Sequence, residues 1–234
     1  MLLSGHSASA IEAKAPLVRA ALRTPRAAAV AGIIFSLLLI ACLWLLHLSV
    51  PSDPLDVGEW LRVSSNRVSL ALNLVPFAGV AFMWFLGVLR DRLGVMEDKF
   101  FATVFLGSGL MFLGMIFVAA AAASGLTRAY VAAPAALSDG SSFTFARAFT
   151  YDVMHVYAFK MAAVFMVTTS TLIFRTRVTA RWIALLGYAS ALFLLFAASY
   201  FDWVLFVFPC WVLLVSVYIL IDNLRAGPMV AASA

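Results

Sequence analysis

The sequence predicts an all-α integral membrane protein, a bundle of six transmembrane helices with both termini in the cytoplasm. Of its 234 residues 65% are hydrophobic and only 12% are charged, about half of the ~25% charged residues that are typical of soluble domains. Five long stretches carry no charge: 27–52, 68–89, 100–127, 182–201 and 203–221. A helix needs ~20 apolar residues to cross the ~30 Å hydrocarbon layer. It also satisfies its own backbone hydrogen bonds there, so each stretch predicts a spanning helix.

The first span is expected at about 25–50. Thr24 followed by Pro25 is typical of a helix start, since threonine caps well and proline fits the first helical position. The apolar run is longer than the 7–15 residues of a signal-peptide core and lacks a small-residue cleavage pattern. Residues 1–24 are therefore expected to form a basic cytoplasmic tail. The next two spans are expected at about 68–90 and 100–124.

The fourth span, expected at about 151–175, must hold a lysine within the membrane. Only 14 uncharged residues separate Lys160 from Arg175, too few to cross, so the span has to begin well before Lys160. The remaining spans are expected at about 181–200 and 203–222. They complete a transmembrane domain over 25–225, which a cytoplasmic tail, 226–234, follows.

The distribution of basic residues sets the orientation. With six spans, eleven lysines and arginines fall on the side of the termini, and Arg62, Arg67, Arg128 and Arg147 fall on the opposite side. The positive-inside rule then places both termini in the cytoplasm. The net charge of +5 serves topology, so we expect contact with a lipid bilayer and not with nucleic acid.

Small residues recur on two predicted helices. Ala28, Gly32 and Ser36 follow one another at four-residue intervals in the first span, and Thr103, Gly107 and Gly114 line one face of the third. Such stripes let helix backbones approach closely. They predict packing within the chain, or alternatively contacts with protein partners or a second copy.

Ionisable residues on the fourth span form the candidate ligand site. Asp152 and His155 lie three residues apart, on neighbouring positions of a helix surface. With Lys160 and Asn73 they predict a site for an anionic solute or lipid headgroup, since ionisable groups inside a membrane are often functional. The structural interpretation, which we favour, is that Lys160 extends its long stem toward the surface or pairs with Asp152 or Asp202.

A haem or metal site is a further alternative. His47 and His155 are expected at similar depth and would supply axial ligands to a haem, and Asp152 with Glu59 would complete a divalent-metal site. Two histidines without evident supporting partners are a weak pattern, so no cofactor is expected. The chain also lacks the motifs of zinc proteases, α/β-hydrolases and phosphate-binding loops, and we expect no enzymatic activity.

The stretch 76–112, PFAGVAFMWFLGVLRDRLGVMEDKFFATVFLGSGLMF, resembles uncharacterised multi-pass membrane proteins of high-GC Gram-positive bacteria. The resemblance implies a bacterial plasma membrane and transfers no activity or site residue. The sequence thus favours a non-enzymatic accessory subunit or a ligand- or lipid-binding membrane component. A transporter or channel for a small solute, ion or lipid is the first alternative, and a membrane-embedded haem or metal protein is the second.

Overall fold

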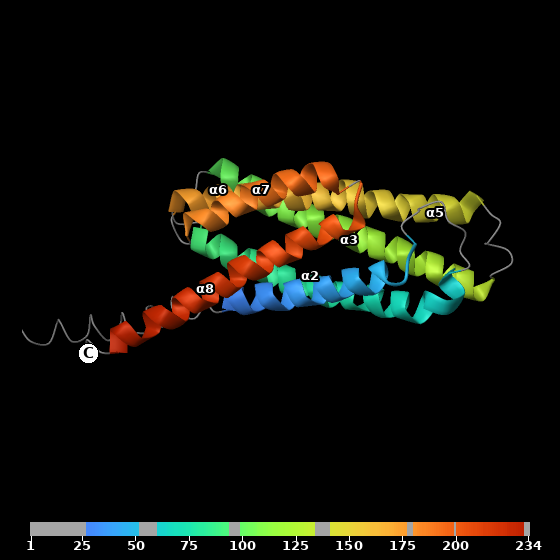
Figure 1. Cartoon of the computed structure of the whole chain (residues 1–234), viewed down its shortest axis with the longest axis horizontal. Coiled ribbons are helices and arrows are strands. Elements are labelled where there is room, and N and C mark those ends of the chain that lie inside the picture. Colours follow the sequence, from blue (N-terminus) through green and yellow to red (C-terminus); the bar gives the residue numbers. More distant parts are fainter. Residues whose placement is uncertain are drawn as a thin grey trace, which may run out of the picture.

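The structure is a computed structural model that describes residues 27–51, 60–93, 99–133, 141–176, 180–198 and 200–231. All regular secondary structure in these ranges is helical, which confirms the predicted all-α architecture. The helices lie side by side along the long axis of the molecule (Figure 1). The basic tail 1–24 and Glu59 lie outside the described residues.

The N-terminal helix spans Ala27–His47. It is followed by α2 (Leu61–Leu93), α3 (Lys99–Ala132) and a long composite helix. The composite helix consists of α5 (Ser141–Asp152), the π-helical turns η2 (Val153–Ala158) and α6 (Phe159–Thr176). The chain ends with α7 (Arg181–Ala197), the 3-10 helix η3 (Asp202–Phe206) and α8 (Val207–Ala231).

Five of these helical segments are long and apolar enough to cross a membrane, and α7 is a shorter apolar helix. With 17 residues, α7 is at the lower limit of about 17–25 residues for a span. The structure therefore supports a multi-pass membrane protein with five or six crossings. The sixth crossing and the orientation of the termini stay predictions.

Three helical segments extend beyond the length of a span. The 33 residues of α2 and the 34 of α3 correspond to about 50 Å each, well over the ~30 Å hydrocarbon layer. Residues 125–149, which lie between two of the expected spans, belong mostly to α3 and α5. Leu61, Tyr130 and Phe143 form a separate hydrophobic cluster there, which explains why the helices continue. We call this the α5 end of the bundle (Figure 1).

Phenylalanines fill the middle of the bundle. Phe35, Phe82, Phe112, Phe165 and Phe208 come from five different helices and are at most 2% exposed. Their rings meet at tilted and edge-to-face angles, with centroids 4.7 Å apart for Phe35–Phe82 and 4.8 Å for Phe112–Phe208. Such pairs contribute about 0.5–1.5 kcal/mol each beyond area burial.

The two small-residue stripes lie in different surroundings. Ala28 and Ser36 are fully buried, and a Cβ added at Gly32 would meet Ser216 of α8 and, at 2.8 Å, Phe85 of α2. The first stripe thus serves packing within the chain. Gly107 and Gly114 of the second stripe face open space, so the expectation of a partner or second copy now concerns this face of α3.

The two prolines inside the predicted spans also differ. Pro76 lies in the middle of α2, where it removes one backbone hydrogen bond without ending the helix. Pro209 is the third residue of α8, which begins at Val207 after the 3-10 helix. Pro209 thus lies near the start of α8, where the 3-10 helix passes directly into the α-helix.

Replacement of Gly32 by alanine is expected to destabilise the protein. The new methyl group has no room between α2 and α8, and overpacking of this kind costs about 1–3 kcal/mol. Gly107→Ala is the matched control: it adds the same atom in open space, where alanine favours the helix by up to about 1 kcal/mol. Thermal melts in detergent should show a lower melting temperature for Gly32→Ala alone; equal melts would contradict the close approach of these helices.

Candidate functional site

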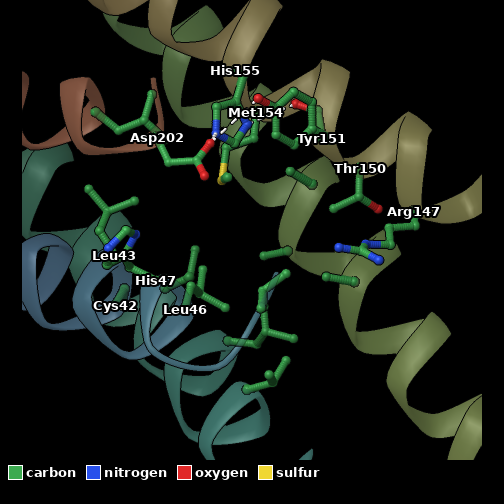
Figure 2. Close-up of a pocket in the computed structure, with 18 of the residues that line it drawn as sticks. Cys42, Leu43, Leu46, His47, Arg147, Thr150, Tyr151, Met154, His155 and Asp202 are labelled. Atoms are coloured by element: carbon green, nitrogen blue, oxygen red, sulfur yellow. Dashed lines mark hydrogen bonds and ion pairs between the residues drawn. The ribbon is translucent and has the colours of Figure 1, made fainter. Parts of the chain in front are cut away.

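A cavity of about 160 Å³ lies among the helices at the α5 end. Its walls come from the end of the N-terminal helix, the first half of α2, the second half of α3, the composite helix and η3. Most of the lining is aliphatic, with leucine, valine and alanine side chains, while the polar positions are those of His47, Trp60, Thr127, Arg147, Thr150, Tyr151, His155 and Asp202. Figure 2 shows Arg147, Tyr151, His155 and Asp202 around an open space between the helices.

The phenylalanines of the core close this cavity toward the middle of the bundle. Phe35 lies one turn before the lining residue Leu39, and Phe112 one turn before Ile116. Phe208 likewise follows Leu205 by three residues and is fully buried. Because these rings are in contact with one another, the cavity ends at them and does not continue as a channel.

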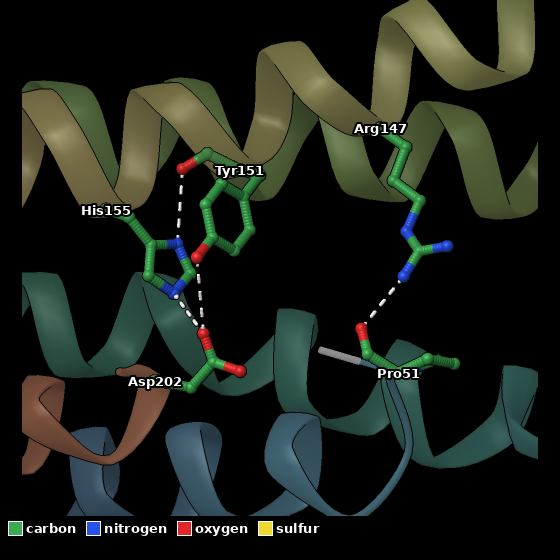
Figure 3. A network of polar contacts seen from close by, with 5 residues as sticks. All are labelled: Pro51, Arg147, Tyr151, His155 and Asp202. Atoms are coloured by element: carbon green, nitrogen blue, oxygen red, sulfur yellow. Dashed lines mark hydrogen bonds and ion pairs between the residues drawn. The ribbon is translucent and has the colours of Figure 1, made fainter. Parts of the chain in front are cut away.

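His155 and Asp202 form a pair that joins the composite helix to η3. His155 Nε2 lies 3.1 Å from Asp202 Oδ1, and the two side chains are 4% and 26% exposed. His155 Nδ1 lies 3.2 Å from the backbone carbonyl oxygen of Tyr151, so this nitrogen is the donor of that hydrogen bond, while Nε2 faces the Asp202 carboxylate. The Tyr151 hydroxyl donates a long hydrogen bond of 3.5 Å to the same Oδ1 (Figure 3).

The local helix geometry places these residues. His155 lies within the π-helical turns 153–158, and π-turns inside α-helices are frequent at functional sites. Arg147, Tyr151 and His155 are four residues apart, slightly more than the 3.6 residues of an α-helical turn. All three residues line the cavity, and the last of them, His155, lies in the wider π-turn. The rings of Tyr151 and His155 stack with centroids 3.8 Å apart.

Arg147 closes the other side of the α5 end. Its side chain is buried, and Nη2 donates a 2.8 Å hydrogen bond to the carbonyl oxygen of Pro51. The guanidinium carbon also lies 5.2 Å from the centroid of the Trp60 ring, within the range of a cation–π interaction. Arg147 therefore holds the segment after the N-terminal helix and the start of α2 against α5 (Figure 3).

Of the residues predicted as a ligand site, the structure brings only His155 to the cavity. Asn73 and Asp152 are exposed and do not line it. Lys160 is half-buried and also lies outside the cavity wall. Among the described residues it forms no ion pair with Asp152 or Asp202, which leaves an extended stem as the favoured interpretation of this lysine.

The structure brings together two of the residues that were considered for a haem or metal site. His47 and His155 line the same cavity, as the prediction of similar depth implied. Both ring nitrogens of His155 already face oxygen atoms, so neither is available as an axial ligand in this arrangement. Within the described ranges no three His, Cys, Asp or Glu side chains gather in a group that fits a metal ion.

The sequence did not predict the roles that three residues of the site have in the structure. The charge distribution used Arg147 only to set the orientation, Asp202 was expected only as a partner of Lys160, and the four-residue spacing of Tyr151 from His155 assigned it no role. Asp202 is 47 residues from His155, so no spacing within one helix connects them. For Arg147 the available signal was its position in an apolar context, between Phe145 and Phe149.

No protein-family model matches the chain, and neither does any curated protein or solved structure.

Arg147→Gln is expected to lower the melting temperature. Loss of a charged hydrogen bond costs about 1.5–3 kcal/mol, and the cation–π contact with Trp60 adds about 0.5–2 kcal/mol. The control is Arg62→Gln, because Arg62 lies at the same end of the bundle but is exposed. Thermal melts in detergent of both variants test this, and a loss of equal size in both would contradict the structural role of Arg147.

Lys160→Met is expected to leave stability unchanged or to raise it. The substitution removes a charge that costs up to about 2.5–3.5 kcal/mol at the centre of a bilayer, and no carboxylate loses its partner. Asp152→Asn and the double variant complete a cycle, in which additive effects are expected for two residues without contact. A fall of several degrees in Lys160→Met, restored in the double variant, would reveal a Lys160–Asp152 pair.

Proposed function

We propose that the protein is a non-enzymatic ligand-binding component of a bacterial plasma membrane, with the cavity at the α5 end as its binding site. The observation that carries this proposal is the combination of an apolar wall with a few polar groups at one end, which is typical of small-molecule sites. With the termini in the cytoplasm, as the charge distribution indicates, the cavity belongs to the outer half of the membrane.

The volume limits the size of the ligand. A buried apolar cavity of about 150 Å³ holds one benzene molecule, and 160 Å³ is therefore enough for one ring or a short stretch of an alkyl chain. Complete drug-sized ligands occupy cavities of about 300–1,000 Å³. The site is thus suited to a small apolar molecule, or to one segment of a lipid whose remainder lies outside the cavity.

Transport is the second candidate function, and the His155–Asp202 pair favours it, because proton-coupled carriers use such ionisable pairs inside the membrane. The phenylalanines that close the cavity toward the middle of the bundle argue against an open path through the protein. A carrier would have to separate the ring contacts among Phe35, Phe112 and Phe208 during each cycle. Ligand binding without transport requires no such movement, so we place it first.

A cavity-filling variant tests the proposed binding site. Ala119 is buried and lines the cavity, so Ala119→Leu fills part of its volume. Ala121→Leu is the matched control, since Ala121 lies two residues further along α3, is exposed and does not line the cavity. Toluene serves as the ligand, measured by its effect on the melting temperature in lipid nanodiscs.

Toluene at ten times its dissociation constant should stabilise the wild type and Ala121→Leu by about 1.4 kcal/mol, or about 3–6 °C for a chain of this size. Ala119→Leu should lose most of this shift, because the added side chain occupies the ligand's space. An equal shift in all three proteins would show that toluene acts through the lipid, and would refute the cavity as a binding site.

A further inference from the structure

The polar end of the cavity points to the chemistry of the ligand. Asp202 Oδ1 accepts hydrogen bonds from His155 and Tyr151. No hydrogen bond to the second carboxylate oxygen, Oδ2, occurs among the described residues. In Figure 3 this oxygen points away from His155 and Tyr151, and Asp202 lines the cavity with a 26% exposed side chain. The cavity therefore presents one hydrogen-bond acceptor beside an apolar wall.

The wall carries one charge of each sign, which favours a neutral headgroup over an ion. The carboxylate of Asp202 disfavours an anion, and the guanidinium of Arg147, which also lines the cavity, disfavours a cation. A neutral group that donates a hydrogen bond satisfies Oδ2 without adding a buried charge.

We infer that the ligand is a neutral, hydroxyl-bearing amphiphile, an alcohol or phenol whose hydroxyl donates to Asp202 Oδ2 while its apolar body fills the cavity. This inference rests on the proposed function and specifies the ligand class for the same site. The aliphatic positions of the wall, including Leu39, Leu72, Val75 and Ile116, receive the apolar body. Asp202 selects against hydrocarbons of the same shape, which leave its oxygen unpaired.

Phenol and toluene are the matched ligands for the test. They have the same number of non-hydrogen atoms and differ by a hydroxyl in place of a methyl group. Their dissociation constants are measured in nanodiscs with the wild type and with Asp202→Asn, whose amide offers a donor in place of the free oxygen. The preference for phenol is the ratio of the two dissociation constants, and it is compared between the two proteins. This comparison cancels the unequal partition of the two compounds into lipid.

Asp202→Asn should reduce the preference for phenol by about tenfold or more, because a hydrogen bond to a charged group is worth at least one order of magnitude in affinity. Tyr157→Phe is the control, since it removes a hydroxyl from an exposed side chain of the composite helix that does not line the cavity; it should keep the preference. If Asp202→Asn does not fold, the wild type alone suffices: phenol should bind about tenfold tighter than toluene after correction for partition into empty nanodiscs.

Other outcomes separate this inference from the proposed function. Equal binding of phenol and toluene, with Ala119→Leu abolishing both, would overturn the hydroxyl recognition and leave the cavity as an apolar binding site. Tighter binding of benzylammonium than of phenol would overturn the neutral class in favour of a cation. If Ala119→Leu weakens the binding of none of these compounds, the proposed function itself is overturned.

Discussion

The phenylalanine contacts in the middle of the bundle are the interaction on which the rest of the structure depends. In lipid no hydrophobic effect drives helices together, so close van der Waals packing has to hold them. Phe82 alone meets the rings of Phe35, Phe112, Phe165 and Phe208, and thereby joins α2 to four other helices. Gly32 adds a close approach of the N-terminal helix to α2 and α8. With the helices fixed at this level, they are free to diverge toward the α5 end.

Two polar contacts limit that divergence and define the cavity. Arg147 connects α5 to Pro51 and Trp60, and His155 connects the composite helix to Asp202. A buried polar group costs free energy unless it finds a partner, so each contact strongly favours one arrangement of the helix ends. The helices that form the apolar wall therefore stay apart between the two contacts, because closer packing of these helices would break the contacts. The π-turn at 153–158 provides the register that both contacts need.

The sequence predicts the helical fold well and the site poorly, for reasons that lie in the physics of the membrane. Long uncharged runs mark the helices because lipid excludes charge, but this signal stops where the hydrocarbon stops. The continuation of α2, α3 and α5 depends on the cluster of Leu61, Tyr130 and Phe143, whose members are distant in sequence. Helical spacing identified His155 but paired it with Asp152 on the same helix, whereas its partner Asp202 belongs to another. Only tertiary structure decides between such carboxylates.

A cavity that persists in a packed bundle has a cost. The residues around it give up dispersion contacts that a filled volume would provide, at about 24 cal/mol for each Å³ of empty space in a soluble protein. An apolar ligand restores those contacts, and a hydroxyl on the ligand provides a hydrogen-bond donor for Asp202 Oδ2. The same features that make the empty site costly are therefore the source of its affinity, which is why we assign the binding of a small amphiphile to this end of the bundle.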